Sequence, residues 1–291
     1  MAVFESDFLK KLEYLALVAR RVFRGRLKAE RRSRAYGSSV EFADYRDYAA
    51  GDDYRYLDWN VYARMDELLL KLFEEEQDLH VYVLLDASQS MASTEAKFHH
   101  GLRVAASLAY IAMSNLDRVA IHPFADGLLP EFPITRGKGK ILTLLEYLER
   151  LAPVQTDTHL EQSARLLLQR RPRRGLIILI SDLYDPRGFE RGLDVLRYHG
   201  DDVQVIHLTE ASEGDPSVLG DLDLVDTETA AVRSVTVTER HLREYGRVYR
   251  GFLARCEHVS RQREVGYVHS TTAVPFEELV LTVLRRGGVV A

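Results

Sequence analysis

The stretch that decides the fold is Val81-Tyr82-Val83-Leu84-Leu85-Asp86-Ala87-Ser88-Gln89-Ser90-Met91. It begins as an apolar run of the kind that forms strands buried on both faces of a sheet. The run ends at the carboxylate Asp86, and the hydroxyls of Ser88 and Ser90 follow at alternate positions. In an open parallel sheet, ligands bind beyond the carboxyl ends of the strands. Three small oxygen donors there suit a hard divalent cation such as Mg²⁺.

A second apolar run also ends in a carboxylate. Residues 175–181 read Gly-Leu-Ile-Ile-Leu-Ile-Ser and are followed by Asp182. If both runs are parallel strands, Asp86 and Asp182 emerge at the same edge of one sheet. The loop Thr156-Asp157-Thr158 lies between them in the sequence and precedes a helix.

The remaining periodicity predicts an α/β fold with a doubly wound, mostly parallel sheet and helices on both faces. Strands are expected at 68–74, 79–85, 118–124, 128–132, 175–181, 203–208 and 265–269, with a β-hairpin over 222–238. Helices are expected at 5–23, 97–116, 140–151, 159–170, 189–198, 239–263 and 275–285. The helix at 5–23 carries its apolar side chains at alternating four- and three-residue spacings, at Phe8, Leu12, Leu15, Ala19 and Val22.

Composition excludes several classes of protein. The chain has 291 residues, 46% hydrophobic and 29% charged, which is typical of a globular protein with a sizeable core. Its formal net charge of −5 argues against a dedicated nucleic-acid binder. The single cysteine, Cys256, fits a reducing compartment. Neither a signal peptide nor an apolar run near the ~20 residues of a membrane span is found, so a soluble, cytoplasmic protein is expected.

The chain is expected to divide near residue 75. Residues 1–75 would hold the first helix, a basic linker and a Tyr/Arg/Asp-rich segment, and residues 76–291 the α/β domain with a hairpin insertion near 221–238. The linker contains the basic cluster Arg20, Arg21, Arg24, Arg26, Lys28, Arg31, Arg32 and Arg34, which is either a solvated face or an anion- or partner-binding surface.

The segment from Tyr36 to Arg64 contains the only tryptophan, Trp59, and little periodicity. We expect Arg46, Arg55, Asp58 and Trp59 to pair and pack as a structural clamp; the alternative is a docking surface. His99 and His100, adjacent on a helix, are expected to face solvent rather than bind a metal.

The strand-end aspartates and their hydroxyls resemble the metal-ion-dependent adhesion site of von Willebrand factor A (vWA) domains. There, an Asp-x-Ser-x-Ser loop, a distant Thr and a distant Asp hold one Mg²⁺. The resemblance implies Asp86, Ser88, Ser90, Thr158 and Asp182 as metal ligands, with Thr156 in reserve for Thr158. The ion would be Mg²⁺, with Mn²⁺ or Ca²⁺ as alternatives. Thr158 also fits a plain helix N-cap.

The resemblance extends to the family called domain of unknown function 58. Its signature is similar to Gly51-Asp52-Asp53, Arg55, Asp58-Trp59 and Ala63-Arg64, and it also includes a turn like Gly137-Lys138-Gly139 and a pair like Ser181-Asp182. This family resembles partners of MoxR-type AAA+ ATPases, which assist the assembly or maturation of other proteins. The resemblance therefore implies a MoxR-type ATPase or its client as partner, bound through an acidic side chain.

Two functions remain open on the sequence. The first is a non-catalytic, metal-dependent protein-binding adaptor, in which a partner's carboxylate completes the coordination of the ion. The second is a metal-dependent hydrolase that uses the same ion as Lewis acid. A hydrolase needs a general base, for which Asp157 is the one nearby candidate. No P-loop and no nucleophile elbow is found, so we expect a binding module without catalytic or further cofactor-binding residues.

Overall fold

A computed structural model describes residues 3–5, 7–23, 32–35, 41–49, 51–76, 79–225 and 232–286. The chain divides into two compact units. The larger contains Met1–Ala19 and His80–Ala291, and the smaller contains Arg20–Leu79. This division differs from the one expected near residue 75, because the first helix groups with the larger unit.

The larger unit is built on a six-stranded sheet in the order β11-β8-β7-β4-β5-β6. The strands are β4 (His80–Asp86), β5 (Arg118–Phe124), β6 (Phe132–Arg136), β7 (Leu176–Ser181), β8 (Asp202–Thr209) and β11 (Gly266–Thr271). All neighbours are parallel except β5 and β6, which confirms the predicted mostly parallel sheet. The chain winds from β4 through β5 to β6, then crosses to β7 on the other side of β4. The topological switch point therefore lies between β4 and β7, where such sheets bind ligands.

The outer strand β6 differs from its prediction. A return strand was expected at 128–132, directly after the turn at Gly127. Instead, Leu128 forms only an isolated bridge with Phe124, and regular pairing starts where Phe132 lies opposite Ile121. The apolar side chains at 128–132 resemble a strand in the sequence, but most of them belong to the connection that precedes β6.

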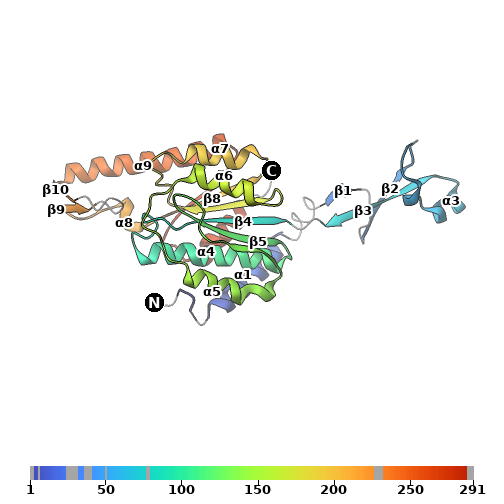
Figure 1. Ribbon diagram of the computed structural model, residues 1–291, viewed down its shortest axis with the longest axis horizontal. Coiled ribbons are helices and arrows are strands. Elements are labelled where there is room, and N and C mark those ends of the chain that lie inside the picture. The colour runs from blue at the N-terminus through green and yellow to red at the C-terminus, as the bar shows by residue number, and fades with distance from the viewer. Residues whose placement is uncertain are drawn as a thin grey trace. The chain divides into compact units, whose positions relative to one another are not determined.

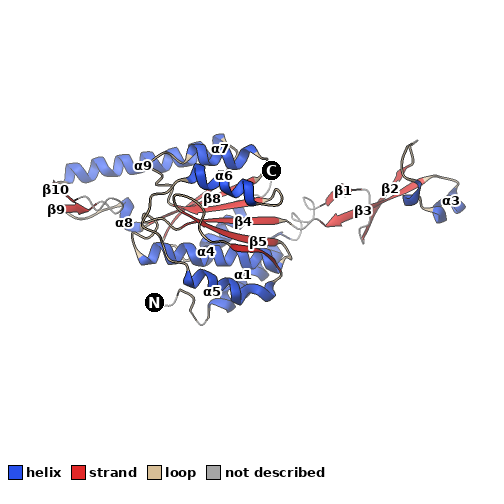
Figure 2. Cartoon of the chain, viewed as in Figure 1, coloured by secondary structure: helices blue, strands red, loops and turns tan. Residues whose placement is uncertain are grey.

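Helices cover both faces of the sheet (Figure 1). One face carries α1 (Phe8–Phe23), α4 (Glu95–Ser114), α5 (Ile141–Arg150) and α10 (Phe276–Arg286). The other carries α6 (Leu160–Arg170), α7 (Glu190–Tyr198) and α9 (Glu239–Gln262). Figure 2 shows the same layers by secondary structure. The core between the sheet and α6, α7 and α9 is apolar, and includes Leu84, Leu179 and Cys256.

The first helix has the predicted amphipathic face. Phe8, Leu12, Leu15 and Ala19 are all buried, whereas Leu17 is exposed. Phe8 packs on Phe276 of α10 with ring centroids 5.4 Å apart, which places α1 against the C-terminal helix.

One helical turn and a hairpin connect β8 to α9. The helical turn α8 (Ala211–Gly214) follows β8, and β9 (Gly220–Val225) then pairs in antiparallel fashion with β10 (Val232–Val237). The hairpin occupies the residues where the sequence predicts one. A 3₁₀ turn, η2 (Lys138–Lys140), leads into α5 over the predicted Gly-Lys-Gly turn.

The smaller unit has its own three-stranded antiparallel sheet in the order β1-β3-β2. Its elements are β1 (Arg32–Ala35), β2 (Glu41–Asp47), η1 (Tyr54–Tyr56), α3 (Trp59–Met65) and β3 (Leu69–Glu76). Four members of the basic cluster, Arg24, Arg26, Lys28 and Arg31, lie outside the described residues.

The charged residues of the Tyr/Arg/Asp-rich segment pair as expected, but its tryptophan does not pack as expected. Arg46 contacts Asp52 and Arg55 contacts Asp53, each at 2.6 Å. Asp58 caps α3 by accepting from two backbone N–H groups. Trp59, however, is 58% exposed. The prediction that Trp59 is a buried part of a clamp was therefore wrong. Trp59 is the first residue of α3, and its ring meets the ring of Tyr62 edge-on, with centroids 6.2 Å apart.

Candidate functional site

The two strand-end aspartates meet at the switch point of the larger unit. Asp86 ends β4 and Asp182 directly follows β7, its parallel neighbour. Both side chains are fully buried, and Ser88 and Thr158 are buried beside them. Ser90 is half-buried and is the most exposed of the five predicted ligands.

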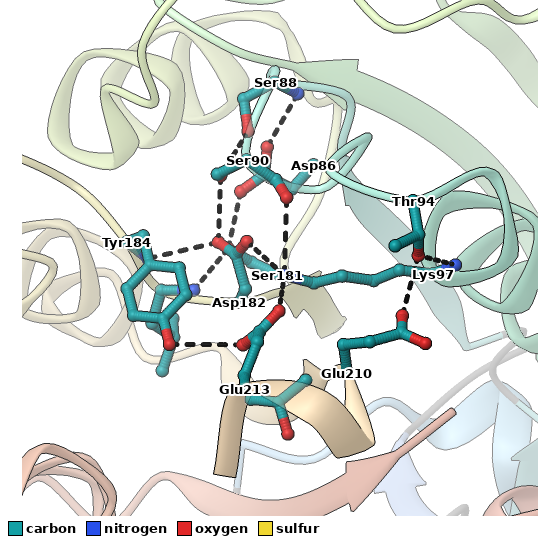
Figure 3. A network of polar contacts seen from close by, with 12 residues as sticks. Asp86, Ser88, Ser90, Thr94, Lys97, Ser181, Asp182, Tyr184, Glu210 and Glu213 are labelled. Atoms are coloured by element: carbon teal, nitrogen blue, oxygen red, sulfur yellow. Dashed lines mark hydrogen bonds and ion pairs between the residues drawn. The ribbon is translucent and has the colours of Figure 1, made fainter. Parts of the chain in front are cut away.

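Hydrogen bonds join all five predicted residues into one cluster. Figure 3 shows four of them, Asp86, Ser88, Ser90 and Asp182. Thr158 Oγ1 lies 3.4 Å from Asp86 Oδ2, and Ser88 Oγ lies 3.1 Å from Ser90 Oγ. Ser90 Oγ in turn lies 3.2 Å from Asp182 Oδ1. The reserve candidate Thr156 is not part of these contacts; its backbone carbonyl accepts from the Gln89 N–H. The structure thus brings together the set that includes Thr158.

Backbone contacts hold the two loops that supply the hydroxyls. The Ala87 N–H donates to Phe124 O at 2.8 Å, which fixes the start of the Asp86–Ser90 loop on β5. The Ala87 carbonyl then accepts from the Val154 N–H at 2.8 Å, so the loop before α6 lies directly beside it. The Asp86 carboxylate also accepts from the Ser88 N–H, an Asx turn that the Asp-x-Ser spacing permits. The site is therefore set by local turns on a rigid sheet.

The electrostatics of the cluster favour a cation. Burial, followed by the negative charge of Asp182, raises the pKa of Asp86 to about 7. Ligand oxygens around Mg²⁺ at 2.0–2.1 Å are spaced by about 3 Å, close to the separations found among the hydroxyls and carboxylates here. The described residues contain no group of three or more His, Cys, Asp or Glu side chains arranged for a metal. The residues present nevertheless fit a site made of oxygen ligands only. Two of these ligands would be carboxylates, and the hydroxyls would have to supply the rest of the coordination.

Lys97 is the residue of the site that sequence reasoning missed. Its side chain is 1% exposed, and its Nζ lies 2.8 Å from both Asp182 Oδ2 and Glu213 Oε1. Glu213, on α8, is further bound by the hydroxyl of Tyr184 at 3.2 Å. The buried carboxylates thus already have one positive charge beside them.

A signal for Lys97 exists in the sequence. Thr94 caps α4, so Lys97 lies in the first turn, where the helix dipole disfavours a positive charge. It is also followed directly by the apolar Phe98, which is buried. A lysine at such a position needs a buried acidic partner. Ser181, which donates to Asp86 Oδ2 at 2.6 Å, is a second missed contact.

Two other polar predictions can be compared with the structure. His100 was expected to face solvent, but it is 6% exposed and lies on the inner face of α4, since that helix is covered by α10. Burial lowers the pKa of His100 to about 4. Asp157, the candidate general base, takes no part in the hydrogen bonds that join the described cluster.

Comparisons with known proteins identify a family and several relatives. A family profile described as "Protein of unknown function DUF58" matches residues 44–250. An uncharacterised protein of Mycobacterium tuberculosis (strain H37Rv) is 22% identical over 231 residues, covering 78% of this chain and 73% of the relative. A counterpart in Mycobacterium bovis shows the same identity and coverage.

Solved structures with partial similarity were also found. The conserved hypothetical protein BatB from Bacteroides thetaiotaomicron has a TM-score of 0.47 at 16% identity, over 72% of this chain and 97% of that chain. Proximal thread matrix protein 1 from the mussel byssus, with a zinc-occupied MIDAS motif, has a TM-score of 0.45 at 13% identity, over 72% and 46%. Within the described residues, no helix is both long and apolar enough to cross a membrane.

Proposed function

The chain belongs to the family of proteins of unknown function DUF58, and we propose that its larger unit is a non-catalytic, metal-dependent protein-binding module. The convergence of Asp86, Ser88, Ser90, Thr158 and Asp182 at the switch point carries this proposal. Mg²⁺, or Mn²⁺ or Ca²⁺ in its place, would be held by two carboxylates and three neutral hydroxyls. Such an ion stays electrophilic, so it attracts a further carboxylate.

The further carboxylate would come from an acidic side chain of a protein partner. Ser90, half-buried, marks the side from which it would approach. The resemblance in sequence adds the class of partner: a MoxR-type AAA+ ATPase, or a client that such an ATPase assembles or matures, in the cytoplasm. Ordinary burial of hydroxyls explains these side chains less well, because the Lys97 ammonium supplies one positive charge to a cluster with two fully buried aspartates, and burying the second carboxylate is costly without a further cation.

Calorimetry tests the metal step. Titration of the full chain with Mg²⁺ or Mn²⁺ should show one site, with and without acetate as a stand-in for the partner's carboxylate. Asp86→Ala should abolish it while the circular dichroism spectrum of the fold is retained. Ser93→Ala is the matched control, since Ser93 lies in the same loop but is exposed. No binding of either ion, even with acetate at millimolar concentration, would refute the metal site.

Capture of a purified MoxR-type ATPase tests the partner step. Binding to the wild-type chain should require Mg²⁺ and be lost on chelation. Ser88→Ala and Thr158→Ala should each weaken it by removing one oxygen ligand, and Ser93→Ala should not. Capture that is indifferent to chelator and to both substitutions would place recognition on another surface.

A further inference from the structure

Lys97 is the one positive charge that contacts the cluster among the described residues, and its position has a consequence for the ion. Its Nζ donates to Asp182, to Glu213 and, at 3.4 Å, to the backbone carbonyl of Ser90 (Figure 3). Asp182 and Ser90 are also predicted metal ligands. The ammonium and a divalent cation would therefore share one carboxylate in a site from which water is largely excluded.

Like charges that share a buried carboxylate repel strongly, because little solvent screens them. A cation that enters the cluster must either displace the ammonium from Asp182 or accept its repulsion. In both cases Lys97 lowers the affinity of the site for the bare ion. Without a cation, the same ammonium offsets part of the negative charge of the buried aspartates.

Glu213 gives the ammonium a second place to bind. Its carboxylate is fixed by the Tyr184 hydroxyl, and its backbone carbonyl accepts from the Tyr245 hydroxyl at 2.8 Å. Glu210, at the start of the same turn, is held by Thr94 at 2.7 Å and by Thr272 at 3.1 Å. The turn that carries Glu213 is thus anchored on several sides. Lys97 can release Asp182 and keep an ion pair.

We propose that Lys97 sets the cation affinity of the cluster: it binds both Asp182 and Glu213 without a cation and Glu213 alone when a divalent cation is held. The inference rests on the proposed function. Because the ammonium weakens binding of the bare ion, the negative charge of a partner's carboxylate raises the affinity for the ion more than it would in a site without Lys97. Metal and partner then bind together, and Lys97 determines how strongly each depends on the other.

Removal of the ammonium tests the inference. Lys97→Met should bind Mg²⁺ more tightly than the wild type by about tenfold or more, as expected for the loss of a buried like charge. Its affinity should also respond less to acetate. The double variant Lys97→Met/Glu213→Gln removes the carboxylate left without its ion pair, and should bind equally tightly even if the single variant folds poorly. Lys140→Met, at an exposed position in another part of the larger unit, is the control.

Thermal melting gives a readout besides affinity. Without metal, Lys97→Met should melt at a lower temperature than wild type, and Mg²⁺ should raise its melting temperature by more than it raises that of the wild type. Suppose that the wild type binds Mg²⁺ at a site that Asp86→Ala abolishes. If both Lys97 variants then bind Mg²⁺ no more tightly than the wild type, this inference is wrong and the proposed function stands. If neither they nor the wild type bind Mg²⁺, with or without acetate, the proposed function itself fails.

Discussion

At the scale of single residues, carboxylates at the starts of turns and helices organise both units. Asp86 and Asp182 accept backbone N–H groups two residues further on, and Asp58 does the same at the start of α3. Each aspartate thereby fixes a loop before it contacts anything distant. Such positions are readable in a sequence, because short acidic side chains favour turns and helix caps.

The ionisation of Asp58 makes the stability of the fold depend on pH. Hydrogen bonds from Tyr45, then from Lys71, lower the pKa of this carboxyl from 3.8 to about 2. A carboxyl with a lowered pKa in the folded state stabilises the fold above its unfolded pKa and loses that effect as the pH falls. The contribution of Asp58 should therefore be intact above pH 4 and disappear between about pH 4 and 2.

The fluorescence of Trp59 reports this loss, since it is the only tryptophan and directly follows Asp58. Acid titration of the wild type should shift the emission in that window. In Asp58→Asn, stability should no longer change with the ionisation of residue 58, and the variant should be less stable than the wild type at neutral pH. Asp194→Asn, in an exposed pair with Arg263 of the larger unit, should titrate like the wild type. An identical acid transition in Asp58→Asn would contradict the assignment.

At the scale of elements, close helix packing is tested by two glycines. A Cβ at Gly192 of α7 would lie 2.3 Å from Leu160 Cγ of α6, so the two helices approach only because this residue has no side chain. A Cβ at Gly251 of α9 would meet nothing within 4 Å. Gly192→Ala should destabilise the fold by about 1–3 kcal/mol through overpacking.

Gly251→Ala should instead stabilise the fold by about 0.5–1 kcal/mol, because alanine has the higher helix propensity. Urea denaturation followed by circular dichroism measures both changes. Opposite signs are expected for the same chemical substitution. A loss of stability at Gly251 comparable to that at Gly192 would show that contact with Leu160 is not what distinguishes the two sites.

The sequence allows most of these elements to be predicted, and the exceptions have physical reasons. Buried parallel strands such as β4 and β7 are continuous apolar runs, and both Asp86 and Asp182 follow from where those runs stop. β6 was misplaced because an apolar connection resembles a strand until its partner is known. Lys97 was missed because its partners are distant in sequence: Asp182 follows β7 and Glu213 lies on α8, and only the folded chain brings them together.

At the scale of the whole molecule, the two units differ in what they carry. All five candidate ligands and Lys97 belong to the larger unit, whereas Trp59 belongs to the smaller. Each unit has its own sheet, so each is expected to unfold in a transition of its own. Circular dichroism mainly follows the helices of the larger unit, and tryptophan fluorescence follows the smaller one alone.

This separation gives a test of where the ion acts. A ligand that binds only the folded state stabilises it by RT ln(1 + [L]/Kd), about 2.7 kcal/mol at a hundredfold excess over Kd. Mg²⁺ should therefore raise the midpoint of the circular dichroism transition and leave the Trp59 transition unchanged. Asp182→Asn should remove the rise, because it deletes a charged ligand at the switch point. A shift of the Trp59 transition alone would place the ion in the smaller unit, whereas equal shifts of both would show that the two units unfold as one.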